Sequence, residues 1–284
     1  MRKMELTKYH ALGNDYLIVE EKKWGDRLTA SAVRAICNRH KGIGADGVLV
    51  HHSEKLQKSF HLKIINPDGS EAEKSGNGLR IYAKYLRDRK LVSDAPFDVV
   101  THGGVVRCQV NQAQNLVTVE MGRVSFHSND IPVAGHPREV IGERIEVNGR
   151  TLEYCAVTIG NPHCIVTSPV IDEMEAKILG PQLETDHRFP NRTNVQFLQT
   201  IDATNIRIEI WERGAGYTLA SGTSSCAAAA VAHRLGLCGP RVNVHMPGGA
   251  LAVQLSPEFD VTIAGSATRI ADCRLTQEWL DNNG

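Results

Sequence analysis

The sequence has no excess charge of either sign. Its 32 lysines and arginines are balanced by 32 aspartates and glutamates, so the formal net charge is zero. A balanced charge provides no basic surface to attract nucleic acid or an anionic membrane, and we expect neither as a partner. No stretch approaches the roughly 18 to 20 apolar residues of a membrane-spanning helix, and the first residues lack the apolar run of a signal peptide. These absences predict a soluble, cytoplasmic protein that acts on a small molecule.

Regular cysteine spacing is also missing. The seven cysteines are odd in number and form no short repeat, unlike a secreted disulfide framework, so we expect reduced thiols. Cys37 lies near His40, and Cys164 follows His163, but no C-x-x-C or H-E-x-x-H accompanies them, and no metal site is predicted. The glycines at 42, 44 and 47 match G-x-G-x-x-G but precede the expected strand 48–51 and open no helix, so they do not indicate a dinucleotide-binding fold, and no phosphate-binding lysine motif indicates pyridoxal phosphate. The chemistry is therefore predicted to need no cofactor.

An internal repeat organises the chain. The segment GNDYLIV at 13–19 recurs as GNPHCIV at 160–166, which is 147 residues further along. Three more matches follow in the same order at offsets of 147 or 146 residues, and chance rarely gives such agreement. They pair DGV at 46–48 with TNV at 193–195, the apolar run before Asn66 with the run before Glu212, and EKSGNG at 73–78 with LASGTS at 219–224.

The repeat predicts two similar lobes. We place the N-terminal lobe at residues 1–120, completed by the C-terminal tail 271–284, and the C-terminal lobe at 121–270. Short apolar or alternating runs bounded by glycine, asparagine and aspartate predict strands, and each lobe also contains one helix, so the fold class is α+β. The expected strands are 16–19, 48–51 and 61–65, the expected hairpins are 98–121 and 242–263, and less clearly marked helices lie at 29–40 and 169–180.

The two central helices differ in their pattern. Leu79–Leu86 carries apolar residues at the spacing of a helix with one buried face. Its counterpart, Cys226–Leu235, is almost all alanine, valine and leucine, and we expect it to be buried on most sides. Both helices follow a Ser-Gly pair, which places Ser75 and Ser221 at helix N-termini, where unpaired N–H groups favour an anion such as a carboxylate.

Two equivalent helix starts in two related lobes predict nearly symmetric chemistry. A racemase or epimerase needs one group on each face of a carbon, one to remove a proton and one to return it. A single serine at a helix start is usually an ordinary N-cap. The duplication favours a cleft between the lobes instead.

Six longer segments support a family resemblance. They are HALGNDYLIV (10–19), GIGADGVLV (42–50), NPDGSEAEKSGNGLR (66–80), GNPHCIV (160–166), TNVQF (193–197) and WERGAGYTLASGTSSCAAA (211–229). Together they resemble the diaminopimelate epimerase family over nearly the whole chain. The resemblance implies two pseudo-symmetric lobes, each a curled sheet around a central helix, with the active cleft between them. It also implies a lysine-biosynthetic epimerase without a cofactor, and a homodimer is possible.

The resemblance also implies roles for individual residues. Arg213 fits the distal carboxylate because a guanidinium grips a carboxylate bidentately, and Glu212 would take the distal ammonium. His163 and Glu212 match polar groups close to the catalytic pair. The other groups that match the distal end of the substrate are Asn14, Asn66, Asn161 and Asn194, and those that match donors to the reacting carboxylate are Gly76, Asn77, Gly222 and Thr223.

The departure from the family lies at the catalytic pair. The family pattern has cysteine where this chain has Ser75 and Ser221, and a serine hydroxyl is a far weaker acid than a thiol. Lys74 and Ser225, beside these positions, are also unusual, which favours natural divergence over two point mutations. Cys164 could approach the cleft as a replacement acid.

Three functions stay open. The first is an amino-acid epimerase of the diaminopimelate type that uses the two serines. The second is a divergent isomerase or lyase with Glu212 or His163 as base, and the third is an inactivated protein that binds an amino acid without turnover. We favour the first, because the binding residues point to a long substrate with a second amino-acid head.

Overall fold

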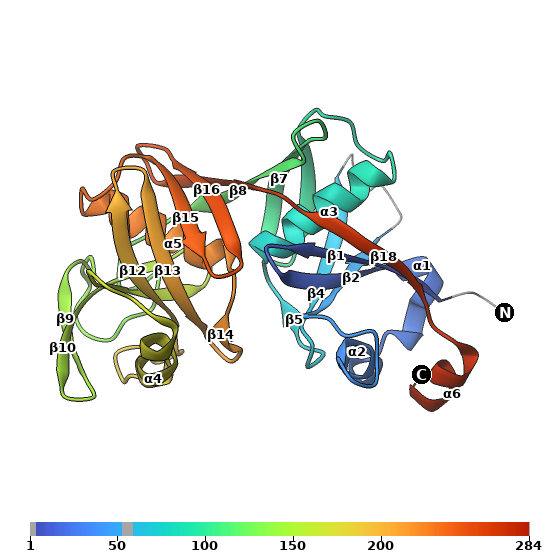
Figure 1. The fold of residues 1–284 in the computed structure, drawn as a ribbon, viewed down its shortest axis with the longest axis horizontal. Coiled ribbons are helices and arrows are strands. Elements are labelled where there is room, and N and C mark those ends of the chain that lie inside the picture. Colours follow the sequence, from blue (N-terminus) through green and yellow to red (C-terminus); the bar gives the residue numbers. More distant parts are fainter. Residues whose placement is uncertain (1–3, 53–58, 284) are drawn as a thin grey trace. The chain divides into compact units, whose positions relative to one another are not determined.

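The structure, a computed structural model, describes residues 4–52 and 59–283, and the chain divides into two compact units. One unit is Met1–Val119 with Gly265–Gly284, and the other is Glu120–Ala264. Residues 265–270, which the sequence placed in the C-terminal lobe, belong to the N-terminal unit. The reason is strand β18 (Thr268–Arg274), which pairs antiparallel with β1 (Glu5–Ala11) (Figure 1).

The N-terminal unit is built on one mixed sheet. From β18 the strands run β1, β2, β3, β4, β6, β7 and β8, and all neighbours are antiparallel except β2 with β3 and β4 with β6. The short β5 adds to β4. The bounds are β2 Asn14–Glu20, β3 Val48–His51, β4 Phe60–Ile65, β5 Glu71–Ala72, β6 Phe97–Thr101, β7 Gly104–Asn111 and β8 Leu116–Arg123.

The sheet of the C-terminal unit repeats this plan. Its order is β9, β10, β11, β12, β13, β15, β16 and β17, the parallel pairs fall at the same two places, and the short β14 adds to β13 as β5 adds to β4. The two halves predicted from the repeat therefore share one topology. The bounds are β9 Glu143–Val147, β10 Arg150–Thr158, β11 Pro162–Thr167, β12 Asn194–Asp202, β13 Asn205–Glu212, β14 Gly216–Thr218, β15 Arg241–Met246, β16 Gly249–Leu255 and β17 Asp260–Gly265.

One long helix packs within each curled sheet, α3 (Gly76–Asp88) and α5 (Gly222–Arg234), and both have 13 residues (Figure 1). The expectation for α5 is confirmed, because every residue from Gly222 to Ala232 is buried. The expectation of a single buried face is wrong for α3, since Arg80 and Ile81 are buried as well as the predicted positions. A central helix surrounded by strands has no solvent face, so its sequence needs no polar stripe.

The remaining helices are shorter. The predicted helices at 29–40 and 169–180 are found as α2 (Ala30–Cys37) and α4 (Glu173–Glu184). Each predicted hairpin is instead a three-stranded meander, β6 to β8 and β15 to β17. The other helical elements are α1 (Glu21–Trp24), the 3₁₀ turn η1 (Gly25–Arg27) and α6 (Gln277–Asn283).

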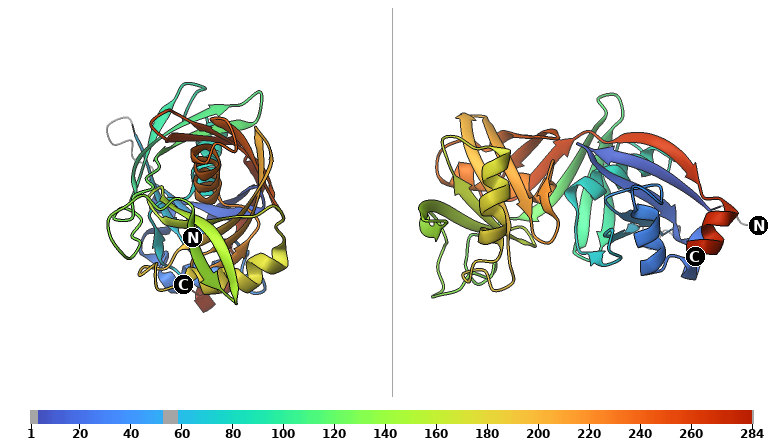
Figure 2. Two further views of the ribbon diagram at one scale, coloured as in Figure 1. Left: turned by 90° about the vertical axis from the view of Figure 1, so that its left-hand side faces the viewer. Right: turned by 60° about the horizontal axis from the view of Figure 1, so that its bottom comes forward.

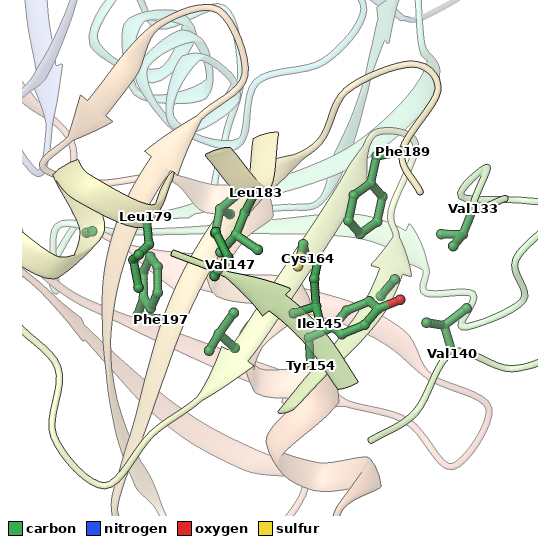
Figure 3. Packing of buried hydrophobic residues seen from close by; sticks show 14 of the residues in the cluster. Val133, Val140, Ile145, Val147, Tyr154, Cys164, Leu179, Leu183, Phe189 and Phe197 are labelled. Carbon is green, nitrogen blue, oxygen red and sulfur yellow. The ribbon is translucent and has the colours of Figure 1, made fainter. Parts of the chain in front are cut away.

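Each unit has its own apolar core. In the N-terminal unit, strand residues and α2 form a cluster onto which Trp279 and Leu280 of α6 pack, beside α2 (Figure 2). In the C-terminal unit, residues of β9 to β12, of α4 and of neighbouring loops form the cluster of Figure 3. No helix within the described ranges is long and apolar enough to cross a membrane.

Candidate active site

Ser75 caps helix α3. Its backbone is extended (φ −140°, ψ 116°), and its Oγ accepts the N–H of Gly78 at 3.0 Å. A Cβ on Gly78 would lie 3.2 Å from this Oγ and 3.3 Å from Leu49, so glycine lets the helix start close against the serine. The hydroxyl of Tyr16 lies 3.4 Å from the same Oγ. The serine oxygen thus faces a helix N-terminus and a phenol.

Ser221 caps helix α5 with nearly the same backbone geometry (φ −143°, ψ 128°). Its Oγ accepts the N–H of Ser224 at 3.4 Å and lies 3.5 Å from Thr223 Oγ1. The Ser221 N–H points to the sulfur of Met246 at 3.5 Å. Both serines therefore sit where backbone donors and the helix dipole favour negative charge.

Asn14 ties strand β2 to the start of α3. Its Nδ2 donates to Asp46 at 2.9 Å, and its Oδ1 accepts from Asn77 Nδ2 at 3.1 Å. Asn77 Oδ1 in turn accepts from the fully buried Arg80 at 2.7 Å, and Arg80 also donates to the carbonyl of Gly76 at 3.3 Å. Asn14, Gly76 and Asn77, predicted separately from the sequence, are thus joined in one network.

A cluster of charged residues supports this network through Asp46, the hydrogen-bond partner of Asn14. Arg39 donates to Asp15 at 2.7 Å and to Asp46 at 2.6 Å, and Lys8 pairs with Asp15 at 2.8 Å. Burial alone would raise the pKa of Asp15, but the hydrogen bonds from Arg39 and Lys8 outweigh it and lower the pKa to about 2. Asp15 is therefore ionised at any pH near neutrality.

His163 lies at the centre of the equivalent network in the C-terminal unit. The ring is fully buried, its Nε2 is 3.0 Å from Asn161 Oδ1, and its Nδ1 is 3.2 Å from Gln196 Oε1. Asn161 donates to Thr223 at 3.5 Å, and Gln196 donates to Ser224 at 3.0 Å. The strand residues of this site are therefore connected to the first turn of α5.

Burial decides the charge of His163. It lowers the pKa to about 3, the Gln196 hydrogen bond opposes it, and Arg213 adds to the lowering. A neutral imidazole has one N–H and one lone pair, so one of the two amides, Asn161 or Gln196, must turn its NH₂ group toward the ring, and the hydroxyl on its other side, Thr223 or Ser224, then donates to that amide instead of accepting from it. Both ring nitrogens are then used within the unit, which leaves no lone pair of His163 for a substrate.

Asn194 and Arg213 meet at the end of β13. Asn194 Oδ1 accepts the backbone N–H of Arg213 at 2.9 Å, and its Nδ2 donates to the carbonyl of Pro162 at 2.9 Å. The guanidinium of Arg213 is exposed and donates to the carbonyl of Asn191 at 3.0 Å. Glu212 precedes it, and its carbonyl accepts the N–H of Ala215 at 3.1 Å in the tight turn that links β13 to β14.

A buried carboxylate not found from the sequence holds this turn. Glu184 accepts from the indole Nε1 of Trp211 at 2.7 Å, from the N–H of Gly214 at 2.9 Å and from Arg192. Its carbonyl accepts the N–H of Thr193 at 3.2 Å. Glu184 therefore fixes the residues on both sides of Glu212 and Arg213, and also the residue before Asn194.

Asn66, the last predicted binding residue, has local hydrogen bonds. Its Nδ2 donates to Ser70 Oγ at 3.0 Å, and its backbone N–H donates to the Ser70 carbonyl at 2.8 Å. These bonds close the turn after β4. Asn66 directly follows β4 in the N-terminal unit, and Glu212 is the last residue of the corresponding strand β13 in the C-terminal unit.

The candidate replacement thiol is not placed for acid–base work. Cys164 belongs to the apolar cluster of Figure 3, and burial raises the pKa of its thiol far above the usual range. Because neighbouring strand residues point to opposite faces, His163 and Cys164 cannot share a site. No disulfide joins any of the cysteines, and no group of three or more metal-ligating side chains occurs in the part of the chain that the structure describes.

Solved structures define the class to which this fold belongs. A hydroxyproline epimerase from Agrobacterium vitis superposes with a TM-score of 0.72, covering 97% of this chain and 91% of that one, at 14% identity. Two lobes of curled mixed sheet with few helices are common to both, and at this identity the likeness concerns the fold alone.

Sequence comparison gives the family. The diaminopimelate epimerase family profile matches residues 6–127 and 155–270. The chain is 50% identical over 275 residues to diaminopimelate epimerase 2 of a Nostoc species, covering 97% of this chain and 96% of the relative. It is 39% identical over 274 residues to the diaminopimelate epimerase of Pelotomaculum thermopropionicum, covering 94% and 97%. The chain belongs to the diaminopimelate epimerase family, whose members are isomerases.

Proposed function

We propose that this chain is a cofactor-independent epimerase that interconverts LL- and meso-diaminopimelate by two-base proton transfer. The observation that carries the proposal is the duplicated helix start. Ser75 and Ser221 have the same backbone conformation, and each Oγ accepts an N–H from the first turn of a 13-residue helix. The reaction that we assign to this pair, the epimerisation of diaminopimelate, is that of the family to which the chain belongs.

The substrate's two ends would be held by different groups. N–H groups of the first helical turns, at Gly76, Asn77, Gly222 and Thr223, would bind the carboxylate of the reacting centre, because helix N-termini favour anions. The exposed guanidinium of Arg213 would bind the distal carboxylate, and Glu212 the distal ammonium. Asn14, Asn66, Asn161 and Asn194 would complete the distal site. A substrate without a second head would leave Arg213 without its partner.

The two serines would exchange protons with the α-carbon, one on each face. One Oγ takes the α-proton while the electron pair stays on the substrate, and the other hydroxyl returns a proton from the opposite side. Since a hydroxyl is a poor acid and base at neutral pH, the backbone donors and helix dipoles must stabilise the alkoxide. We assign His163 the role of positioning Asn161, because its ring is neutral and both of its nitrogens are engaged.

Exchange of the substrate α-proton with deuterated solvent tests the proposal. Ser75→Cys combined with Ser221→Cys should raise exchange and epimerisation by about 100-fold or more, because only the proton-transfer groups are deficient. Each single change should give much less epimerisation, since each face needs its own group. The parent protein is the control, and measurable exchange by it would show that the serines are competent.

Two outcomes would contradict the proposal. If the folded double variant is inert toward diaminopimelate and other amino acids, the cleft serves another reaction, such as an isomerase or lyase step with Glu212 as base. If parent and variants bind diaminopimelate tightly but none exchanges its proton, the chain is an amino-acid-binding protein.

Binding can be tested apart from turnover. Diaminopimelate should raise the melting temperature of the parent by mass action, and Arg213→Ala should abolish that shift because the distal carboxylate loses its bidentate partner. Arg234→Ala is the matched control: Arg234 is an exposed arginine of the same unit that pairs with Glu139. Equal shifts in parent and Arg213→Ala would remove Arg213 from the site.

A further inference from the structure

We propose that Tyr16 is a positioning residue that makes Ser75 more acidic by donating a hydrogen bond to its oxygen. The two hydroxyl oxygens are 3.4 Å apart, and the Gly78 N–H approaches the same Oγ at 3.0 Å. Only the catalytic consequence of this role of Tyr16 rests on the proposed function. The effect on acidity at position 75 can be measured without turnover.

The strand geometry aims Tyr16 at the helix start. Asn14 and Tyr16 are two residues apart on β2, so their side chains leave the same face of the sheet. Asn14 contacts Asn77, and Tyr16 contacts Ser75, so both strand residues reach the beginning of α3. The Tyr16 side chain is thus built into the site.

Tight packing fixes the phenol. The side chain is 6% exposed, and a Cβ at Gly47 would come within 2.7 Å of the Tyr16 ring. Glycine at this position therefore makes the space that the ring occupies. A side chain held in this way loses little further freedom when it forms a hydrogen bond.

The direction of the hydrogen bond follows from charge. While Ser75 is neutral, either hydroxyl can donate. When the Ser75 oxygen is negative, only Tyr16 can donate, and charge-assisted O–H···O⁻ bonds shorten to about 2.5–2.7 Å. Two donors, the Gly78 N–H and the Tyr16 O–H, then stabilise the anion, and hydrogen bonding to the charged form lowers the pKa of an acid.

The repeat shows that this contact is specific to one half. Tyr16 and His163 occupy equivalent positions, each two residues after a site asparagine, Asn14 or Asn161. His163 makes its hydrogen bonds to Asn161 and Gln196, whereas Tyr16 reaches the serine itself. We therefore assign Ser75 a phenolic donor and Ser221 a hydroxyl neighbour, Thr223, so the two faces of the reaction are served by unequal groups.

A thiol at position 75 reports the effect. In Ser75→Cys, the pH dependence of iodoacetamide alkylation at this position, followed by peptide mass spectrometry, gives the pKa of the thiol. Adding Tyr16→Phe should raise the alkylation midpoint by about 0.5 to 1 pH unit, which lowers the rate at neutral pH by about three- to tenfold. The other charged groups nearby, Lys74, Arg80, Asp46 and Arg39, are the same in both variants.

Tyr9→Phe in the same Ser75→Cys background is the matched control. It removes another buried phenol from the paired strand, one that donates to Asp88 at 2.9 Å, and it should leave the midpoint unchanged. An equal midpoint with and without Tyr16→Phe would overturn the proposal. So would an equal shift with Tyr9→Phe, because the effect would then be a general loss of packing.

A second variant covers the case in which Tyr16→Phe does not fold. Site-specific replacement of Tyr16 by 4-fluorophenylalanine fills the space of the hydroxyl but cannot donate, so the midpoint should again move to higher pH. No movement in that variant would overturn the proposal. If the midpoints move as expected but no variant exchanges the α-proton of diaminopimelate, the role of Tyr16 stands and the proposed epimerase function fails.

Discussion

Glu184 illustrates, at the scale of single residues, how a buried carboxylate can determine the shape of a turn, here the one that carries the proposed binding residues Glu212 and Arg213. A side chain that is 5% exposed accepts from an indole of β13, a backbone N–H of the β13–β14 turn and a guanidinium of the loop before β12. A buried carboxylate without donors would be costly, so the need of Glu184 for hydrogen bonds holds these three donors in place around it. The hydrogen bonds of Glu184 therefore determine where Glu212 and Arg213 lie in the turn.

We predict that Glu184→Gln raises the KM for diaminopimelate more than it lowers kcat. Glutamine keeps one acceptor oxygen for Gly214 but turns an NH₂ group toward the Trp211 N–H, so the turn that carries Arg213 loosens while Ser221 keeps its cap. Steady-state kinetics in the Ser75→Cys, Ser221→Cys background measure the effects on KM and on kcat separately. Glu139→Gln, which alters an exposed ion pair with Arg234, should change neither constant. A kcat effect larger than the KM effect would contradict this role.

Sequence reasoning proposed site residues that lie within recognisable segments, such as Asn14, Asn161 and Asn194, and their roles stay predictions. It missed Glu184, which is 30 residues from Gly214 and meets it only through folding. Gln196 was also missed, although it lies two positions after Asn194 and therefore on the same face of β12, a signal that strand periodicity could have supplied.

At the scale of elements, the charged cluster of Asp15, Arg39 and Lys8 joins the β1–β2 turn to the loop before β3. Arg39 bridges Asp15 and Asp46, and Lys8 also donates to the carbonyl of Gly44 at 2.7 Å. Because Asn14 is hydrogen-bonded to Asp46, the cluster positions a proposed substrate-binding amide through its supporting loop.

We predict that Asp15→Asn lowers the free energy of unfolding by about 2 kcal/mol at neutral pH. The pKa of Asp15 is depressed in the folded state, so its contribution is fully present above about pH 4 and is lost as the pH falls toward about 2. Urea unfolding of parent and variant across this range should show two curves that converge in acid. Asp94→Asn, an exposed partner of Arg87, is the control with little expected effect. A constant difference at every pH would exclude the electrostatic explanation.

Elements with strong local patterns could be predicted. The duplicated strand–loop–helix segments gave both central helices and the strands that precede them, because glycine, asparagine and serine mark their ends. The burial of Arg80 could not be predicted, because its acceptors Gly76 and Asn77 lie one turn earlier on the same helix and would be available whether or not strands enclosed that helix. Short strands such as β5 and β14 have two or three residues and exist through pairing alone.

At the scale of the whole molecule, the two units are duplicates in topology but not in chain continuity. The C-terminal unit is one uninterrupted segment, whereas the N-terminal unit takes its edge strand β18 and helix α6 from the far end of the chain. The internal repeat predicted the duplicated topology. The unit boundary at residue 265 could be placed only from the pairing of β18 with β1, which joins segments more than 250 residues apart in the sequence.

We predict that deletion of residues 266–284 selectively destabilises the N-terminal unit. β1 would lose one of its two partner strands, and the core would lose Leu275 and the packing of Trp279 and Leu280, so the melting temperature of this unit should fall by about 10 °C or more. Calorimetry would resolve a transition for each unit. Deletion of residues 276–284 alone keeps β18 and should cause a smaller fall. An unchanged N-terminal transition in the longer deletion would contradict the assignment of these residues.

Strand β18 follows the whole C-terminal unit in the sequence but belongs to the N-terminal unit, and this affects the order in which the two units can fold during synthesis. Domains usually fold from the N-terminus during synthesis. Here the first 119 residues emerge early but cannot complete their sheet without β18, while the contiguous segment 120–264 is complete before β18 is translated. The C-terminal unit can therefore fold first, and until β18 emerges the nascent chain carries β1 with an open edge, the kind of surface that chaperones protect from aggregation.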